Sequence, residues 1–236
     1  MKKALLYTLL LCGLGAQAQI GTRVFGKDPI INLENFDKQR VHWGYFLGFN
    51  SYDFKFDYKV DPGKDIIVKS TTGFNVGLVG NLRLFEYLDL RFEPGLYYTQ
   101  RDLAFPNIQD AYDRLREVKS TYIHFPLLLK FSSKRVGNVR PYLTGGVSRT
   151  WNLDSNEFVK DDNITGDRFR MKTWTNNYEL GFGIDLYFEY FKFSPSIRGV
   201  FSFDDEIIRD NDPSSPYTGN IGSMKTRAIL VNFTFH

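Results

Sequence analysis

Hydrophobic and polar residues alternate along most of the chain, and the alternation defines eight segments. A period of two is typical of β-strands that have one apolar face and one polar face. The shared apolar faces lie, in chain order, within residues 41–49, 74–82, 90–98, 123–131, 143–151, 178–188, 191–203 and 229–235. A strand that crosses a membrane at a tilt needs about 9–11 residues. These lengths predict an all-β fold of eight antiparallel transmembrane strands.

The C-terminal segment indicates that the sheet closes on itself. In an extended chain, Ile229, Val231, Phe233 and Phe235 lie on one face of this segment. At the edge of an open sheet such a strand is an aggregation site. Pairing of the last strand with the first removes both edges and makes a closed barrel. The sequence therefore predicts an outer-membrane β-barrel over residues 40–236.

The faces opposite the apolar series carry glycine, small residues and charges. Six ionisable residues on these faces define an interior polar cluster, namely Arg91, Glu93, His124, Lys130, Glu179 and Arg198. An apolar outer wall with a polar interior is typical of a barrel in lipid, and a soluble ligand-binding barrel has the reverse arrangement. The alternation alone does not say which face is outside. Aromatic residues near the strand ends and the N-terminal leader favour lipid outside.

The interior polar cluster is interpreted as structural, because opposite charges inside a narrow barrel can pair and fill it. The interior of an eight-stranded barrel is just wide enough for side chains, and Phe46, Tyr97 and Tyr142 also point into it. A proton or ion relay is the alternative, and it needs an aqueous path. On the outer face, the series Ile229, Val231, Phe233 and Phe235 is interpreted as a membrane-insertion signal read by the barrel-insertion machinery.

Connections between the predicted strands alternate in length. The short ones lie near residues 85–87, 132–138 and 189–190, and the long ones lie near residues 58–72, 102–119, 152–173 and 204–222. Bacterial outer-membrane barrels have short periplasmic turns and long extracellular loops. We therefore expect both termini in the periplasm and the long loops outside the cell.

The first residues have the features of a secretory signal peptide. A basic start at Lys2 and Lys3 precedes a short apolar run and a small-residue triplet that ends at Ala18. A membrane-spanning helix needs about 20 residues, and this apolar run is shorter. We expect residues 1–18 to be removed, which makes residues 19–39 a periplasmic N-terminal extension.

Composition excludes several classes of function. The formal net charge is +3, and removing Lys2 and Lys3 leaves +1 (+3 − 2), with no basic stripe that would indicate nucleic acid binding. The only cysteine, Cys12, lies in the predicted signal peptide, so the mature chain has no thiolate for a disulfide or a metal. No other apolar stretch is long enough for a spanning helix, so if the chain lies in a membrane, it crosses as strands.

Candidate chemistry is sparse. The chain has three histidines, of which His42 and His124 face the predicted interior and His236 is the last residue. A hydrolase needs serine, histidine and a carboxylate in one cluster. Ser120 and Ser132 lie near the ends of the strand of His124, at no useful offset. No catalytic, cofactor-binding or metal-ligating residue is assigned, and we expect neither enzyme activity nor a cofactor.

Two loop segments leave alternatives open. In residues 107–118, Ile108, Leu115 and Val118 share a helical face after the potential cap Asn107, which predicts a short helix. This segment is either a packed cap or ordinary loop, or a helix that binds a partner. Residues 161–167 are acidic, but a helical calcium loop needs glutamate at its twelfth position, where Lys172 stands. A solvated loop is therefore favoured over a calcium site.

Several stretches resemble known outer-membrane proteins. YIHFPLLLKF (residues 122–131), RPYLTGG (140–146) and ELGFGID (179–185) resemble the small outer-membrane barrels common in the Bacteroidetes. More specific stretches are NFD (35–37), WGYFLGFN (43–50), YDFKF (52–56), REVKSTY (116–122), EYFKFSPSIRG (189–199), IRDNDP (208–213) and VNFTF (231–235). Together they resemble the PorT/SprT family of the type IX secretion system, from about residue 32 to the end of the chain.

This resemblance implies a role in exporting proteins with a C-terminal sorting domain, and in gliding motility where the organism glides. The implied partners are other type IX secretion components, besides outer-membrane lipid and the barrel-insertion machinery. The family has no catalytic residues that could be transferred to this chain. A general outer-membrane barrel with a surface-structure or adhesion role fits the loops equally well and is the main alternative. An outer-membrane enzyme and a soluble ligand-binding barrel are the others.

Overall fold

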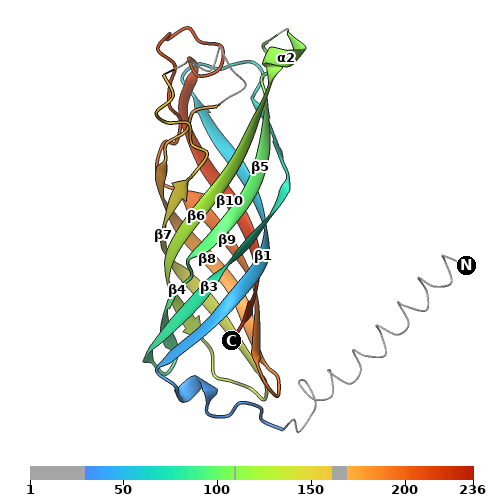
Figure 1. The fold of residues 1–236 in the computed structure, drawn as a ribbon, viewed down its shortest axis with the longest axis vertical. Coiled ribbons are helices and arrows are strands. Elements are labelled where there is room, and N and C mark those ends of the chain that lie inside the picture. The colour runs from blue at the N-terminus through green and yellow to red at the C-terminus, as the bar shows by residue number, and fades with distance from the viewer. Residues whose placement is uncertain (1–29, 109, 161–168) are drawn as a thin grey trace, which may run out of the picture.

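The computed structural model describes residues 30–108, 110–160 and 169–236, which form an antiparallel β-barrel (Figure 1). The strands are β1 (Val41–Tyr58), β2 (Ile67–Ser70), β3 (Thr72–Phe85), β4 (Leu88–Phe92), β5 (Gly95–Ala104), β6 (Leu115–Ser132), β7 (Val139–Asn152), β8 (Trp174–Tyr187), β9 (Lys192–Ser202) and β10 (Ile221–Phe235). Two short helices are η1 (Phe36–Lys38) and α2 (Ala111–Arg114). Among these residues, no helix is long and apolar enough to cross a membrane.

The ten strands form eight staves of the barrel, which we call walls. Two of these walls are interrupted strands: β2 continues into β3, and β4 continues into β5. Between β4 and β5 the interruption falls at Glu93 and Pro94, and proline cannot donate to a ladder. The register with β6 is nevertheless the same on both sides, with Phe92 opposite Leu127 and Gly95 opposite His124. The first strand, β1, pairs with both β10 and β3, so the ring closes. The prediction of an eight-stranded antiparallel barrel is confirmed.

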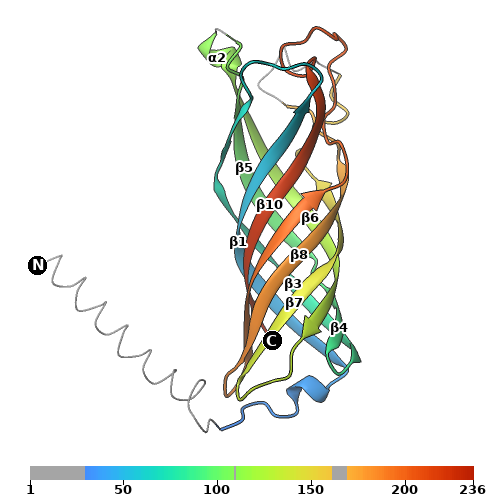
Figure 2. The same cartoon turned by 180° about the vertical axis from the view of Figure 1, so that it is seen from behind.

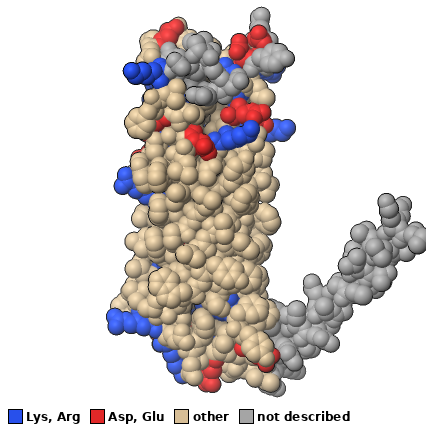
Figure 3. All heavy atoms as spheres, viewed as in Figure 1, with Lys and Arg blue, Asp and Glu red and all other residues tan. Residues whose placement is uncertain are grey.

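The outer wall is apolar over its middle. Outward residues such as Trp43, Leu78 and Leu180 are more than half exposed although they are large and hydrophobic. Figure 3 shows that Lys, Arg, Asp and Glu gather near the two ends of the barrel and leave the middle of the visible wall almost free of charge. An uncharged apolar band between two charged ends is the outer surface of a barrel that sits in lipid.

The two ends of the barrel differ. Figures 1 and 2 show the long loops at one end, while the short turns, η1 and the C-terminus lie at the other. At the long-loop end, the loops pack over an apolar cluster that continues the barrel interior. Its buried members are Phe54, Leu103, Phe105, Val118, Phe169, Met171, Ile207, Tyr217, Ile221 and Met224. The described parts of these loops therefore form a cap on the barrel.

The predicted helix over residues 107–118 is wrong for most of its length. Only α2 is helical, and β6 already begins at Leu115, opposite Ala104 at the end of β5. Pairing between strands satisfies these backbone groups and overrides the local helical pattern. The same extension makes the loop shorter than the predicted residues 102–119. The short strand β2, which pairs with the upper part of β5, was also not predicted.

Two predictions lie outside the described residues. The signal peptide, residues 1–18, is one of them, together with the first part of the extension. The acidic segment of residues 161–167 is the other. Within the described ranges, no group of three or more His, Cys, Asp or Glu side chains is placed to hold a metal ion.

Candidate functional site: the lumen and its two ends

Five of the six residues of the interior polar cluster form one network across the middle of the lumen. Arg91 pairs with Glu93, and Arg198 pairs with both Glu93 and Glu179, the latter at 2.9 Å between Nη1 and Oε2. The other carboxylate oxygen of Glu179 lies 2.7 Å from Nε2 of His124. All five side chains are buried. The network bridges opposite walls, because β4, the β4–β5 interruption, β6, β8 and β9 each supply one member.

Threonine hydroxyl groups form hydrogen bonds with the outer members of this network. Nδ1 of His124 lies 2.8 Å from Oγ1 of Thr150, which also accepts a hydrogen bond of 2.9 Å from the Asn177 amide. Nη2 of Arg91 donates to Oγ1 of Thr234 at 3.2 Å. A buried charge is strongly destabilising when one partner is missing, so this arrangement holds the walls in one register.

The sixth residue, Lys130, belongs to a second cluster nearer the short-turn end. Its Nζ lies 2.6 Å from Oδ2 of Asp185, and Nζ of Lys192 lies 3.8 Å from the same oxygen. Ser194 donates to the other carboxylate oxygen at 2.6 Å. The ammonium of Lys130 also lies over the Tyr142 ring, 3.9 Å from its centroid. One carboxylate thus contacts two buried ammonium groups from different strands.

A third polar layer lies toward the long loops. The guanidinium of Arg101 donates to Ser120 at 3.1 Å and to the Tyr122 hydroxyl, and it lies 3.9 Å from the Phe54 ring centroid. Above it, Glu206 accepts hydrogen bonds from the backbone N–H and the hydroxyl of Thr226, at 2.9 and 2.7 Å. Burial raises the pKa of the Glu206 carboxyl against the effect of these hydrogen bonds. The carboxyl fastens the loop after β9 to β10.

Aromatic and aliphatic residues fill the lumen between the polar layers. Phe46, Tyr97 and Leu230 are fully buried, and the Phe46 and Tyr97 rings pack with centroids 6.2 Å apart. The Tyr97 ring meets His124 edge to face at 5.1 Å. An eight-stranded barrel leaves room only for side chains, and here charged and aromatic residues occupy that room.

At the short-turn end, residues 30–40 form a strap across the barrel. The Asn138 amide accepts a hydrogen bond from the Asn32 backbone N–H at 2.9 Å and donates to the Ile30 carbonyl at 2.8 Å, as a neighbouring strand would. Arg135 donates to the carbonyls of Asn32 and Leu33. Leu33 has a φ of +47°, which is rare for a residue with a side chain. The turn 132–138 thus binds the backbone of the strap.

Asp37 and Phe36 fasten the second half of the strap. The Asp37 carboxylate accepts hydrogen bonds from the Tyr187 hydroxyl at 2.7 and 2.8 Å and pairs with Arg140 at 3.4 Å. The Phe36 ring stacks on the His42 imidazole, with centroids 4.6 Å apart and planes 6° apart. The strap therefore lies against the short-turn mouth of the lumen.

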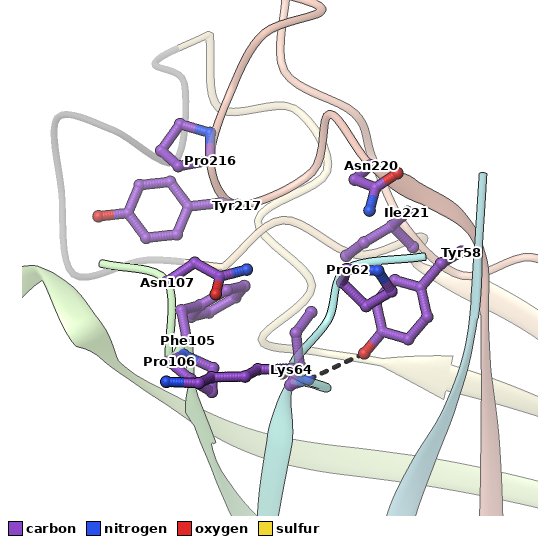
Figure 4. Close-up of a pocket in the computed structure, with 11 residues that line it drawn as sticks. Tyr58, Pro62, Lys64, Phe105, Pro106, Asn107, Pro216, Tyr217, Asn220 and Ile221 are labelled. Carbon is purple, nitrogen blue, oxygen red and sulfur yellow. Dashed lines mark hydrogen bonds between the residues drawn. The ribbon is translucent and has the colours of Figure 1, made fainter. Parts of the chain in front are cut away.

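At the long-loop end, a shallow pocket of about 370 Å³, part of it open to solvent, lies between three loops (Figure 4). It is lined mainly by aromatic rings and prolines, including Tyr58, Phe105 and Tyr217. Two of its polar side chains join the loops: the Tyr58 hydroxyl accepts from the Ile66 N–H at 2.8 Å, and the Asn220 amide pairs with the Val60 backbone. The pocket side chains therefore hold the loops together.

Sequence reasoning missed several of these groups. Asp185 and Lys192 face inward by the same alternation as Glu179 and Arg198, so parity was a sufficient signal for them. Arg101 was missed because the predicted strand ended too early. The contacts of the strap could not be predicted from the sequence, because residues 30–40 show no hydrophobic periodicity. The four residues of the proposed insertion signal lie on the outer face of β10, beside β1 and β9.

Eight closed walls, an apolar band facing lipid and a filled polar lumen define a small β-barrel of the bacterial outer membrane. The family model described as "Outer membrane protein beta-barrel domain" matches residues 17–207, and the chain belongs to this family. No curated protein matches the chain.

Solved structures of small outer-membrane proteins are similar to the chain. OprG of Pseudomonas aeruginosa is 15% identical, with a TM-score of 0.45, over 82% of this chain and 92% of that one. Neisserial surface protein A is 8% identical, with a TM-score of 0.45, over 83% and 98%. Ail of Yersinia pestis, solved with the heparin analogue sucrose octasulfate, is 14% identical, with a TM-score of 0.40, over 84% and 99%. At these values the similarity concerns the fold alone.

Proposed function

We propose that this chain is a non-enzymatic component of the type IX secretion machinery, and of gliding motility where the organism glides. It acts as an accessory or assembly component through protein contact and is not the conduit. The stretches that resemble the PorT/SprT family support the assignment to type IX secretion. The filled lumen supports action by contact, and it is the observation that carries the proposal.

The lumen cannot pass a polypeptide. Aqueous channels need about 16 strands, whereas the interior of an eight-stranded barrel is filled by side chains. In this chain the network from Arg91 to His124 crosses the lumen, and the strap lies against one mouth. Opening a path would leave several buried charges without partners, which is costly. Export that depends on this protein must therefore use another conduit.

The two ends offer the surfaces for contact with other secretion components. At the short-turn end, the strap and the adjoining turns expose Ile30, Ile31, Val136 and Tyr190, each more than half exposed. Exposed apolar residues that cluster at one end favour a protein partner. At the other end, the ordered loops present Val60 and Phe158, both largely exposed. Of the two, the strap end faces the periplasm, where substrates await export.

Deletion of the gene tests this proposal. We expect proteins with the C-terminal sorting domain to accumulate in the periplasm of the deletion strain, and the wild-type gene to restore export. A gene encoding I30D and V136D should fail to restore it, although the barrel is present in the outer membrane. A gene encoding E117Q, a change on the exposed rim, is the matched control and should restore export.

Normal export in the deletion strain would contradict the secretion role. If such a strain instead lost attachment to surfaces, the general surface-structure or adhesion role would be favoured. Failure of E117Q alongside the double variant would show only that the barrel tolerates no change, so heat-modifiable mobility on gels must accompany each assay.

A further inference from the structure

One charged residue lies inside the apolar band of the outer wall. Arg149 points outward from β7 and is exposed. The outward residues on either side of it along the strand are Val147 and Trp151, and the apolar Leu153 follows toward the loops. Across the ladder its neighbours are Phe125 on β6 and Asn176 on β8. A charge so placed in lipid is costly unless it finds a partner or reaches the interface.

Two other outward cations near this end, Arg227 and Lys119, lie nearer the loops and have a carboxylate partner. Arg227 on β10 pairs with Asp53 through Nε at 2.7 Å, and the outward residue beyond it toward the loops is the charged Lys225. Lys119 on β6 lies 3.3 Å from Glu117. These residues stand at the charged rim and are neutralised within the protein. Arg149 has neither a rim position nor, among the described residues, a carboxylate within 4 Å.

Instead of a carboxylate, Arg149 has an aromatic support. Its Cζ lies 4.6 Å from the centroid of the Trp174 ring. Trp174 in turn stacks on Trp151, with centroids 5.5 Å apart and planes 13° apart. A guanidinium on an aromatic face is held in place while its N–H groups remain available at the edge. Within the described part of the chain, no hydrogen-bond acceptor takes these donors.

Asn176, the cross-strand neighbour of Arg149, is itself bound to Asp204, which accepts hydrogen bonds from its backbone and side-chain N–H at 2.7 and 3.0 Å. The stem of an arginine can follow an apolar surface while its head reaches the interface. Trp174 begins β8 at the long-loop end, so contact with it directs the head toward the outer headgroup layer.

We propose that Arg149, supported by Trp174 and Trp151, binds a phosphate group of the phosphorylated glycolipid that forms the outer leaflet. The planar fork of arginine matches two phosphate oxygens at once, which a lysine does not offer. The long-loop end faces outside in bacterial outer-membrane barrels, so the lipid beside this patch belongs to the outer leaflet. A basic residue at the headgroup level with an aromatic neighbour is a site for anionic lipid.

Lipid retention by the purified full-length mature protein tests this site. The protein is equilibrated in detergent with lipid A, with dephosphorylated lipid A or with phosphatidylglycerol, and bound lipid is counted by native mass spectrometry. We expect wild-type protein to retain severalfold more lipid A than dephosphorylated lipid A or phosphatidylglycerol. R149Q should retain the three lipids equally. The preference of R149K for lipid A should lie between those of the wild type and R149Q. R227Q, the matched control, should behave as wild type.

Each other result overturns the proposal. Equal retention of lipid A by wild type and R149Q would remove Arg149 from the site. Equal retention of phosphatidylglycerol would point to any anionic lipid, and displacement by inorganic phosphate at low concentration would point to a soluble ligand. A loss in R227Q as large as in R149Q would indicate a general charge effect. Heat-modifiable mobility shows which variants are folded, and R149K provides a second test if R149Q is not.

Discussion

At the scale of single residues, the lumen is organised by buried charges that each serve more than one partner. Arg198 joins two glutamates from different walls, and Asp185 joins two lysines. Such sharing makes each carboxylate more important than one of an isolated surface ion pair, because its loss removes contacts to two buried side chains at once. Buried ion pairs are therefore better understood as fixing the register than as a net source of stability.

Glu179→Ala tests the importance of a carboxylate that serves two buried partners. The change leaves His124 and Arg198 without one shared carboxylate, so we expect the free energy of unfolding to fall by roughly 3–5 kcal/mol. Glu117→Ala removes an exposed carboxylate at 3.3 Å from Lys119 and should cost about 0–1 kcal/mol. Urea unfolding in lipid vesicles, followed by tryptophan fluorescence, measures both. Equal losses would show that the lumen relaxes around the missing charge.

Alternation reveals which residues point inward but not which of them meet. Glu179 and Arg198 are on neighbouring strands, so their pairing is accessible from the sequence. The pairing of Glu93 with Arg198 is not, because it crosses the lumen between walls that are not adjacent. Such contacts depend on strand tilt and stagger, which leave no local pattern in the chain. The aromatic support of Arg149 comes from Trp174 on the adjacent strand β8, so like the pairing of Glu179 with Arg198 it is accessible from the sequence.

At the scale of elements, strand boundaries and the strap are where sequence reasoning was weakest. The strands with a strong apolar series were predicted well, because burial in lipid demands the alternation. The segment 107–118 was mistaken for a helix because its apolar residues are spaced three to four apart. In β6, however, Leu115 and Val118 lie on opposite faces, and pairing with β5 decides the outcome. The first half of the strap is held through its backbone, to which the side chains of Arg135 and Asn138 hydrogen-bond, and such contacts carry little sequence signature.

Truncation after Leu230 tests the role of the last strand. It removes residues that pair with β1, such as Phe233 opposite Leu47, and residues that pair with β9, such as Phe233 opposite Pro195. The barrel loses both the closing seam and outward apolar burial, so we expect little folded protein in the outer membrane. Heat-modifiable mobility on gels measures the folded fraction.

A second variant separates pairing from signalling in the same strand. Phe235→Ala keeps the backbone ladder and removes one residue of the proposed insertion signal. We expect slower assembly in cells but near-normal stability of the purified barrel. Wild-type assembly rates in this variant would argue against the insertion signal, whereas normal levels of the truncated protein would argue against the seam.

Cysteine labelling tests which end of the barrel faces outside. The single native cysteine, Cys12, lies in the predicted signal peptide. Phe158→Cys lies in a long loop and is largely exposed, and Lys134→Cys lies in an exposed short turn. Gly137 is unsuitable, because its φ of +58° disfavours a residue with a side chain. On intact cells, a membrane-impermeant reagent should label the first variant and not the second. The reverse result would invert the topology.

At the scale of the whole molecule, the barrel is obstructed at three levels. The strap lies against the short-turn mouth, the ion-pair network crosses the middle, and the loop cluster covers the other end. Strand count alone predicts a narrow lumen, but it does not predict obstruction at both ends. This obstruction supports the proposal that the molecule acts through its surfaces at the two faces of the membrane and not as a conduit.

Conductance provides the test at this scale. Purified protein in planar bilayers should show no large stable conductance, because filled space and paired charges leave no continuous water path. Deleting the strap, residues 30–40, should not create one, since the network of Arg91, Glu93 and Arg198 still crosses the lumen. Removing the strap and introducing R198A and E93A together leaves buried groups unpaired and should give only small, unstable openings if the barrel folds. A large stable conductance from the wild-type protein would refute action by contact, and the same conductance from the strap deletion alone would identify the strap as the plug.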